Sequence, residues 1–238
     1  MKTIILNSGV ARRLKPLTDD LPKCLLEVNG KTILERQLEC LTNSGIREIV
    51  ITTGPFAEKI IEHVERRFPG LDVNYVNNPE YEVTNYIYSI WLAKDFLKDN
   101  ILLLHGDMIF DCNLISKILD KKDGNYVLVN NKIEPPEKDF KALIKNERVS
   151  KIGVNYFGAD VYFCAPIYKF IEKDFSLWLR QMEIFIKEGK DKCYAEDAFN
   201  EISEIIKLQP LYFGEESCME VDSLEDLKEA QRIFHPSN

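Results

Sequence analysis

The chain begins with a short run of strand character, Thr3-Ile4-Ile5-Leu6, which passes directly into the turn Asn7-Ser8-Gly9-Val10-Ala11-Arg12-Arg13. A short apolar run that ends at a turn is typical of a strand buried on both faces of a parallel sheet. The turn after such a strand lies at the carboxyl edge of the sheet, where open α/β folds bind their ligands. The backbone N–H groups of this turn are therefore candidates to face phosphate oxygens.

Predicted strands and helices alternate along the first half of the chain. Apolar runs predict strands at 48–53, 73–76, 101–105 and 126–129, and amphipathic patterns predict helices at 33–41 and 57–68. This order of elements requires a largely parallel sheet with right-handed crossovers. We therefore expect an α/β fold with a Rossmann-like, mixed and mostly parallel central sheet flanked by helices.

The second half is less regular. A charged segment with two prolines, 130–139, predicts an exposed connection. After it we expect strands around 141–144 and 158–164, and helices around 167–173, 177–187, 198–206 and 223–234. The sequence has no internal repeat or low-complexity tract, so residues 1–238 are expected to form one domain, with 131–238 as a smaller subregion beside 1–130.

The composition excludes several classes of protein. Hydrophobic residues make up 45% of the 238 residues and charged residues 29%, which is typical of a globular protein. The formal net charge of -8 provides no basic surface for nucleic acid or an anionic membrane. No apolar stretch approaches the roughly 20 residues of a membrane span or resembles a signal peptide. We expect a cytoplasmic monomer or homodimer, with no nucleic-acid partner and no membrane insertion.

The cysteines show no functional spacing. There is no C-x-x-C pair and no cluster with the spacing of metal ligands, so we expect thiols rather than a metal site. The six cysteines are Cys24, Cys40, Cys112, Cys164, Cys193 and Cys218.

The turn after the first strand matches neither G-x-x-x-x-G-K-[ST] nor G-x-G-x-x-G, which excludes P-loop and dinucleotide-binding motifs. On spacing alone it is as consistent with an ordinary βα turn as with a phosphate cradle. Together with residues 21–34, however, it resembles the opening of the nucleotidyltransferases that join a nucleoside triphosphate to a phosphorylated small molecule. Their pattern is roughly L-A-A-G-x-G-[ST]-R-L-x-P-L-T, then P-K, then V-x-G-K-P-I-L. The matching residues are Leu6, Gly9, Arg13, Leu14, Pro16, Leu17, Thr18, Pro22, Lys23, Gly30 and Lys31.

The departures from this pattern are Asn7-Ser8 for Ala-Ala, Ala11 for the second glycine, Arg12 for Ser or Thr, and Thr32 for Pro. Ala11 matters most, because its Cβ restricts a positive φ and the approach of the backbone to a phosphate. The resemblance makes 1–130 the nucleotide-binding half and 131–238 the acceptor-binding half. It assigns nucleotide contacts to Leu6, Asn7, Ser8, Gly9, Val10, Ala11 and Arg12. Arg12 is equally consistent with a solvated surface arginine.

The same resemblance makes Arg13 and Lys23 catalytic cations. When a phosphate oxygen attacks the α-phosphorus, two polyanions approach one another and charge develops on pyrophosphate, so positive groups must offset it. The resemblance also implies a Mg²⁺ ion held by Asp107, at the end of a predicted strand, and by Asp222, within Met219-Glu220-Val221-Asp222-Ser223. Magnesium prefers hard oxygen ligands of this kind. Taken alone, either aspartate could be an ordinary strand-end or turn residue.

The segment 78–93 is similar to the N-x-x-Y-x-x-x-N-N-x-Y-S stretch of bacterial phosphocholine cytidylyltransferases, and it lacks the P-x-G-x-A-x-A segment of sugar-1-phosphate enzymes. This similarity places Asn78, Asn85 and Ser89 near the nucleotide or at the floor of its pocket. An Asn amide is chemically able to read the mixed donor and acceptor edge of cytosine. The apolar residues Ile87, Ile90, Trp91 and Ala93 are interpreted as the core face of a helix capped by Thr84 or Asn85.

Phosphocholine enzymes hold the ammonium group with aromatic faces and a carboxylate. The corresponding residues here are Tyr194, Glu196 and Asp197, and Ala195 stands where such enzymes can have a tryptophan. This difference leaves primary ammonium acceptors as competitors. Alternatively, Glu196 and Asp197 form only the acidic first turn of a helix.

These patterns predict a magnesium-dependent cytidylyltransferase that transfers CMP from CTP to a small phosphorylated or phosphono amine and releases pyrophosphate. Phosphocholine, phosphoethanolamine and 2-aminoethylphosphonate are the candidate acceptors. One alternative is a sugar-1-phosphate nucleotidyltransferase that uses UTP, dTTP or CTP. Another, suggested by Ala11 and Asn7-Ser8, is a catalytically weak nucleotide-binding regulatory module.

Overall fold

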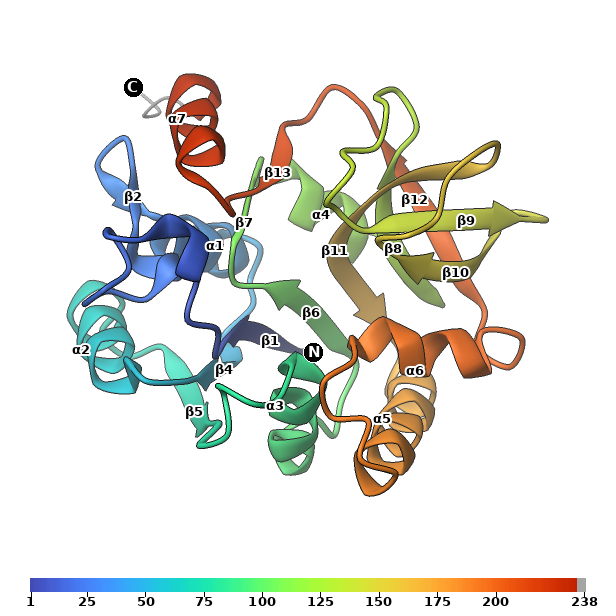
Figure 1. Cartoon of the computed structure of the whole chain (residues 1–238), viewed down its shortest axis with the longest axis horizontal. Helices are drawn as coiled ribbons and strands as arrows, with labels where there is room; N and C mark the ends of the chain where they lie inside the picture. Colours follow the sequence, from blue (N-terminus) through green and yellow to red (C-terminus); the bar gives the residue numbers. More distant parts are fainter. Residues whose placement is uncertain (235–238) are drawn as a thin grey trace.

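The computed structural model describes residues 1–234 and has a nine-stranded mixed sheet at its centre (Figure 1). The main path has the order β10-β9-β11-β6-β1-β4-β5, and β8 pairs with both β11 and β12. The four strands β6-β1-β4-β5 are parallel, whereas β11 runs antiparallel to β6, β8 and β9. The strands of this sheet are β1 Lys2–Asn7, β4 Glu48–Thr53, β5 Asp72–Asn77, β6 Ile101–His105, β8 Asn125–Asn130, β9 Lys141–Lys145, β10 Arg148–Gly153, β11 Val161–Phe170 and β12 Leu208–Phe213. The predicted α/β class with a mixed central sheet is confirmed.

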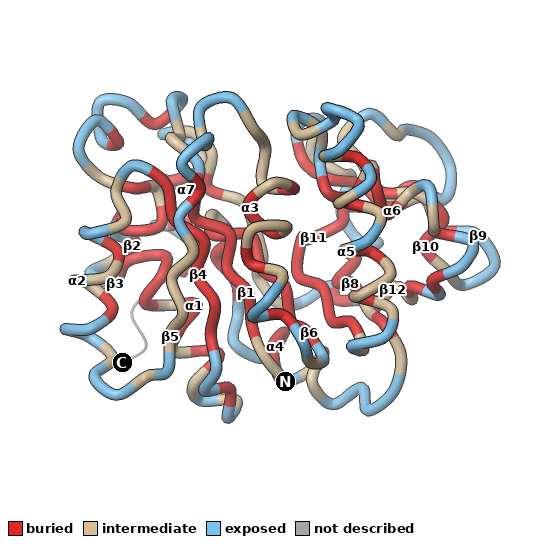
Figure 2. The backbone as a smooth tube through the Cα atoms, turned by 90° about the horizontal axis from the view of Figure 1, so that it is seen from below, coloured by how far each residue is buried: buried red, intermediate tan, exposed pale blue. Residues whose placement is uncertain are grey.

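Helices cover both faces of the sheet because apolar side chains alternate along its strands. On β1, Ile4 and Leu6 pack in one core with α3, α5 and α6, whereas Ile5 packs in a second core with α1, α2 and α4. Figure 2 shows that the central strands are buried along most of their length. The helices are α1 Ile33–Asn43, α2 Ala57–Arg67, α3 Tyr86–Leu92, α4 Asn113–Leu119, α5 Glu172–Lys187, α6 Ala195–Ile202 and α7 Leu224–Ile233, with short 3-10 turns η1 Arg12–Leu14, η2 Lys23–Leu25 and η3 Lys94–Phe96. None of the helices within residues 1–234 has the length and apolar character that a bilayer span requires.

Two small sheets complete the fold, and one of them brings the C-terminal segment to the centre of the molecule. Strand β13 (Cys218–Glu220) pairs antiparallel with β7 (Met108–Phe110), and β2 (Glu27–Val28) pairs with β3 (Lys31–Thr32). One residue past β13, the N–H of Val221 donates to the carbonyl of Asp107 at 2.9 Å. The pairing therefore places residues near the C-terminus beside the end of β6.

The helix predicted at 167–173 is wrong. Strand β11 continues to Phe170, and α5 begins only at Glu172. The pairing of β11 with β8 shifts register between Ala165 and Tyr168, at an irregularity that interrupts the alternation of the strand. Because both faces of this stretch are also buried, its apolar pattern has no period of two, and sequence periodicity could not distinguish it from a buried helix.

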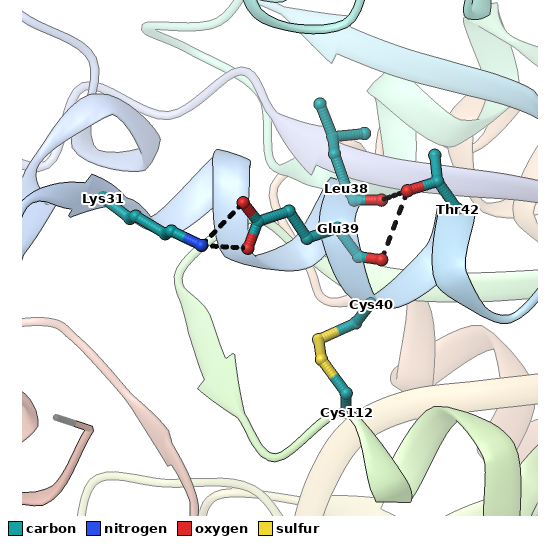
Figure 3. The surroundings of a disulfide bond; sticks show 6 residues. All are labelled: Lys31, Leu38, Glu39, Cys40, Thr42 and Cys112. Carbon is teal, nitrogen blue, oxygen red and sulfur yellow. Dashed lines mark hydrogen bonds and ion pairs between the residues drawn. A yellow bond between two sulfur atoms is a disulfide. The ribbon is translucent and has the colours of Figure 1, made fainter. Parts of the chain in front are cut away.

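The expectation that all six cysteines are thiols is also wrong, since Cys40 and Cys112 form a disulfide (Figure 3). The bond joins the buried end of α1 to the start of α4, across 72 residues of sequence, so the spacing of single cysteines could not reveal it. The other four cysteines are free, and burial raises the pKa of the Cys24 thiol to about 12. Cys24 is therefore an unreactive core residue.

Candidate active site

A cavity of about 300 Å³ opens at the carboxyl ends of the parallel strands β1 and β6. Its walls come from the turn after β1, the loop after β6, the start of α3, the segment that follows β13 and the start of α6. Of the predicted site residues, those that line it are Leu6, Asn7, Ser8, Gly9, Arg13, Lys23, Asn78, Asn85, Ser89, Asp107, Tyr194 and Asp222. Val10, Ala11, Arg12, Glu196 and Asp197 are not among the lining residues.

The turn after β1 is held between two glycines. A Cβ on Gly106 would lie 1.8 Å from Oδ1 of Asn7, and a Cβ on Gly54 would lie 2.4 Å from the carbonyl oxygen of Ser8. The N–H of Gly106 also donates to the carbonyl of Leu6 at 3.1 Å. Only glycine permits these close approaches, so the loops after β4 and β6 fix the position of Asn7-Ser8 at the cavity wall.

Ala11 adopts the positive φ that its place in the motif required. Its φ is 44° and its ψ is 51°, in the left-handed region, where a Cβ is disfavoured by about 1 kcal/mol or more. The hydroxyl of Thr18 donates to the carbonyl of Ala11 at 2.9 Å and closes the loop. The loop therefore keeps the backbone shape of a glycine-containing turn, although the chain has alanine there.

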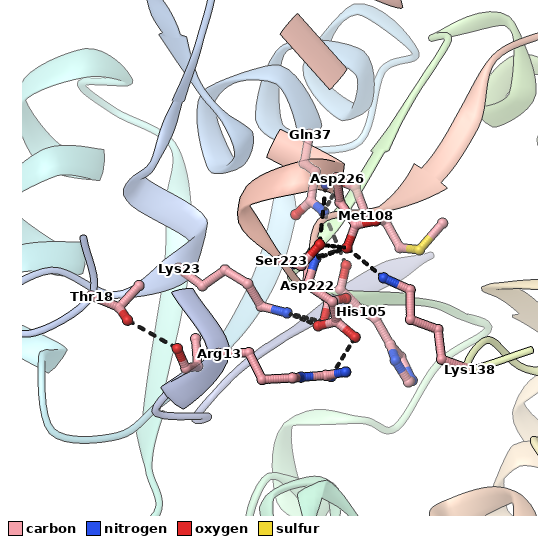
Figure 4. A network of polar contacts seen from close by, with 12 residues as sticks. Arg13, Thr18, Lys23, Gln37, His105, Met108, Lys138, Asp222, Ser223 and Asp226 are labelled. Carbon is pink, nitrogen blue, oxygen red and sulfur yellow. Dashed lines mark hydrogen bonds and ion pairs between the residues drawn. The ribbon is translucent and has the colours of Figure 1, made fainter. Parts of the chain in front are cut away.

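Lys23 contacts both predicted metal ligands, and Figure 4 shows it beside Asp222. Its Nζ lies 2.7 Å from Oδ2 of Asp107 and 2.5 Å from Oδ1 of Asp222. Arg13 contacts the other oxygen of Asp222, with 2.6 Å between Nη2 and Oδ2. Two carboxylates separated by more than a hundred residues therefore meet beside two cations at one end of the cavity.

Burial and charge oppose one another at this cluster. Burial alone would lower the pKa of Lys23, but its two carboxylate partners outweigh burial and raise that pKa. Burial would likewise raise the pKa of Asp107, yet Lys23 lowers it overall. Burial raises the pKa of Glu220, and three neighbouring carboxylates raise it further, so it lies well above the usual value. These neighbours are Asp107, Asp139 and Asp222. The cluster therefore holds more acidic groups than its cations neutralise.

The donor atoms of this cluster fit a magnesium ion. Oδ1 of Asp107 and Oε1 of Glu220 are buried without a hydrogen-bond partner, and both residues line the cavity. Within residues 1–234 there is no group of three or more His, Cys, Asp or Glu side chains arranged as a complete metal cage. Mg²⁺ typically uses only one or two carboxylates together with substrate phosphates, so an incomplete protein cage is compatible with it.

Asn78, Asn85 and Ser89 form a hydrogen-bonded floor. The Asn78 amide, which is 1% exposed, donates to the hydroxyls of Ser89 and Thr84 at 3.0 Å each. Asn85 caps α3 by accepting from the N–H of Tyr86 at 2.7 Å. The amide groups of Asn78 and Asn85 therefore form hydrogen bonds within the protein and fix the shape of the cavity floor. Ile87, Ile90 and Ala93 lie in the core, and Trp91 is only partly buried.

Glu196 and Asp197 have different environments. Glu196 is 1% exposed and accepts hydrogen bonds from the hydroxyls of Tyr86 and Tyr168, the latter at 2.8 Å. Burial and the adjacent Glu196 carboxylate raise the pKa of both phenols well above 10, so they remain donors. Asp197 instead accepts from the N–H of Tyr194 at 2.9 Å and caps α6. The helix-start interpretation therefore describes Asp197, whereas Glu196 is a buried carboxylate behind the cavity wall.

Four aromatic side chains stand in front of Glu196, and we name this group the aromatic box. It consists of Tyr86, His105, Phe140 and Tyr194, and all four line the cavity. The His105 ring lies 4.7 Å from that of Tyr86 and 5.8 Å from that of Phe140, and the Phe140 ring lies 5.0 Å from that of Tyr194. The box therefore presents ring faces and edges in front of a buried carboxylate.

Sequence reasoning missed several residues of the cavity. Glu220 precedes Asp222 by two positions, so strand alternation is a signal that both face one side. His105 and Phe140 belong to strand and loop segments that show no functional pattern of their own. Lys138 and Asp139 belong to the predicted exposed connection, yet Lys138 lines the cavity and Asp139 is 6% exposed.

Comparison with known proteins agrees with this geometry. Residues 2–140, more than half of the chain, match the family described as nucleotidyl transferase. The chain belongs to the nucleotidyl transferase family, and the resemblance found in its sequence is confirmed.

Two relatives have names that refer to a phosphorylated or a phosphono amine. The choline-phosphate cytidylyltransferase of Streptococcus pneumoniae is 27% identical over 247 residues, which cover 100% of both chains. The CMP-5'-(3-aminopropyl)phosphonate synthase of Streptomyces rubellomurinus is 28% identical over 57% of this chain, and the match covers only 22% of that longer protein. Among solved structures, a putative glucose-1-phosphate thymidylyltransferase of Bacillus anthracis has a TM-score of 0.82 and 22% identity, and covers 100% of this chain and 96% of its own. That likeness shows the fold alone.

Proposed function

We propose that this protein is a magnesium-dependent cytidylyltransferase that forms a CDP- or CMP-linked amine from CTP and a small phosphorylated or phosphono amine, with release of pyrophosphate. The observation that carries the proposal is that one cavity contains both the Arg13, Lys23, Asp107 and Asp222 cluster and the aromatic box. The first suits a triphosphate with its metal, and the second suits an ammonium group. The full-length similarity to a choline-phosphate cytidylyltransferase supports the same reaction class.

In this mechanism the acceptor's phosphate oxygen attacks the α-phosphorus of CTP, and the bond to the β-phosphate breaks, so that pyrophosphate leaves. A Mg²⁺ ion bound by Asp107 and Asp222 would supply positive charge to the triphosphate. Lys23 and Arg13 pair with these carboxylates at the same end of the cavity, so their positive charges lie where the phosphate oxygens of CTP would bind. Their charge offsets the repulsion between the two substrates and the charge that develops on the leaving group.

Among the candidate acceptors, the aromatic box favours phosphocholine. Both oxygens of Glu196 already accept hydrogen bonds from tyrosine hydroxyls. Glu196 is only 1% exposed, so it acts as a negative charge behind the rings rather than as a direct partner for N–H donors. This suits a trimethylammonium group, because that group has no N–H to satisfy. A primary ammonium would bring three N–H donors that need partners.

A matrix of pyrophosphate-release assays tests the proposal. CTP, UTP, dTTP and GTP are each combined with phosphocholine, phosphoethanolamine, 2-aminoethylphosphonate and glucose 1-phosphate, with free choline as the matched control that lacks phosphate. We expect turnover with CTP and phosphocholine, none with free choline, and loss of activity with EDTA that Mg²⁺ restores.

Two other results would point elsewhere. Turnover of glucose 1-phosphate with UTP, and of no amine, would establish the sugar-1-phosphate alternative. Tight calorimetric binding of CTP without turnover of any acceptor would instead support a nucleotide-binding regulatory module.

A further inference from the structure

The segment between β8 and β9, residues 131–139, ends on the cavity wall, and we name it the strap. Most of the strap is exposed, but Asp139 is buried and Lys138 lines the cavity with a side chain that is 39% exposed. Phe140, which follows directly, belongs to the aromatic box. The strap therefore brings a cation into the same cavity as the box.

A buried lysine fixes the shape of this end of the strap. Lys141 is 1% exposed, and its Nζ donates to three backbone carbonyls: Glu137 at 2.7 Å, Asp139 at 2.9 Å and Val154 at 2.9 Å. Three backbone acceptors satisfy all three N–H donors of the ammonium group. The backbone on both sides of Lys138 is thus anchored, and Lys138 has a defined place at the cavity.

The partner of Lys138 in this structure is already satisfied without it. Oδ2 of Asp226 lies 2.5 Å from Nζ of Lys138, and the same oxygen accepts from the N–H of Asp222 at 3.0 Å and from the N–H and hydroxyl of Ser223 at 2.8 and 2.9 Å. Asp226 is the capping-box residue of α7. Exchange of Lys138 from Asp226 to a ligand anion would therefore leave no buried, unpaired group behind.

Lys138 reaches the cavity from a different part of the chain than the other two cations. Lys23 and Arg13 contact Asp107 and Asp222, on the side that the nucleotide loop forms. The ammonium of Lys138 lies beside this cluster, because the Asp226 oxygen that it contacts also accepts from the N–H of Asp222. Phe140, two residues further along the chain, belongs to the aromatic box, so Lys138 lies between the cluster and the box. We propose that Lys138 binds the phosphate or phosphonate group of the acceptor while the aromatic box holds its ammonium group. This inference rests on the proposed function and adds the residue that recognises the acceptor's anionic end.

Steady-state kinetics with varied acceptor and varied CTP test this role. The wild type is compared with Lys138→Ala, the charge-preserving Lys138→Arg, and Lys132→Ala, a matched control elsewhere in the strap. For Lys138→Ala we expect the KM for phosphocholine to rise at least tenfold and the KM for CTP to change less than twofold. Lys138→Arg should recover most of this loss, and Lys132→Ala should match the wild type.

The variant Asp226→Asn tests whether Lys138 acts by binding the acceptor or only through its ion pair with Asp226. Ser223 remains the N-cap of α7, and the amide oxygen of an asparagine at position 226 can still accept from the N–H of Ser223, so α7 should remain formed while the ion pair to Lys138 is lost. If Lys138 serves the acceptor, the KM for phosphocholine should not rise in this variant. If the KM for phosphocholine rises equally in Asp226→Asn and Lys138→Ala, the ion pair between Lys138 and Asp226 determines that KM, and the proposal is overturned. A rise in the KM for CTP alone would overturn it as well.

The test remains informative if the proposed function fails. Should the wild type use glucose 1-phosphate and no amine, the same ratio of KM values is measured with that acceptor, because it carries the phosphate that Lys138 is proposed to bind. If no acceptor is turned over, inorganic phosphate is titrated into the CTP-bound protein. Weaker phosphate binding by Lys138→Ala, by fivefold or more, supports the role, and equal binding by wild type and variant contradicts it.

Discussion

The side of the cavity that we propose binds the nucleotide and the side that we propose binds the acceptor are assembled from the chain in contrasting ways. Arg13, Lys23 and Asp107 belong to segments that follow two adjacent parallel strands, β1 and β6, and the pairing of β13 with β7 adds Asp222. The aromatic box instead takes single residues from α3, β6, the position directly after the strap and the start of α6. A sheet edge can concentrate charge from short motifs, whereas a pocket for an organic group needs side chains from many segments.

The largest effect is expected on the nucleotide side. Asp107→Asn and Asp222→Asn each remove a negative charge that we assign to the metal, so turnover should fall about a thousandfold while the fold is kept. Pyrophosphate release measures turnover, and circular dichroism measures folding. Asp95→Asn, at an exposed carboxylate, is the matched control. Near-normal rates in both site variants would refute the metal assignment.

Arg13→Ala should lower kcat about a hundredfold, because its charge is needed most as pyrophosphate departs. Arg13 is 65% exposed, so the variant should be as stable as the wild type in urea unfolding. An effect confined to the KM for CTP would show that Arg13 only binds the ground state.

The acceptor side is tested by a pair of equivalent changes in one helix turn. Glu196→Gln removes the charge behind the aromatic box and should raise the KM for phosphocholine about tenfold. Asp197→Asn keeps a side chain able to cap α6 and should change that KM by less than twofold. If both variants behave alike, the assignment of the box to the ammonium group is wrong.

The same contrast explains how much the sequence could predict. Local periodicity predicts the strands at 3–6 and 101–105. A long sequence motif predicts the four charged site residues, Arg13, Lys23, Asp107 and Asp222. The end of β11 is misread because Ile167 to Phe170 are buried on both faces, beside a register shift. Lys138 and the disulfide between Cys40 and Cys112 depend on tertiary contacts across many residues, which no local pattern records.

Asp139 lies between Lys138 and Phe140 in the chain, and its buried carboxyl group should make the stability of the protein depend on pH. Burial raises its pKa from 3.8 to about 6, with Lys138 opposing the shift and the nearby Asp222 and Asp226 adding to it. The native state therefore binds the proton more tightly than the unfolded chain, and this contribution to stability is lost as pH rises from about 4 to about 6. Above that range the ionised carboxylate costs up to about 3 kcal/mol.

Asp139→Asn removes this cost. Measured by urea unfolding in EDTA, the variant should be more stable than the wild type at pH 7.5 and nearly equal to it at pH 4. A gain of the same size at both pH values would show that the effect comes from packing rather than from the proton.

The smallest effect is expected at Ala11, whose positive φ stores strain in the turn after β1. Ala11→Gly should relieve about 1 kcal/mol of strain, partly offset by the greater freedom of glycine in the unfolded chain. We therefore expect a net gain in stability below about 1 kcal/mol in urea unfolding and a turnover within twofold of the wild type. Since Thr18 already holds the carbonyl of Ala11, the turn keeps its left-handed shape with alanine present. A rise in turnover of tenfold or more would instead show that the alanine impairs the nucleotide side, which is the premise of the regulatory-module alternative.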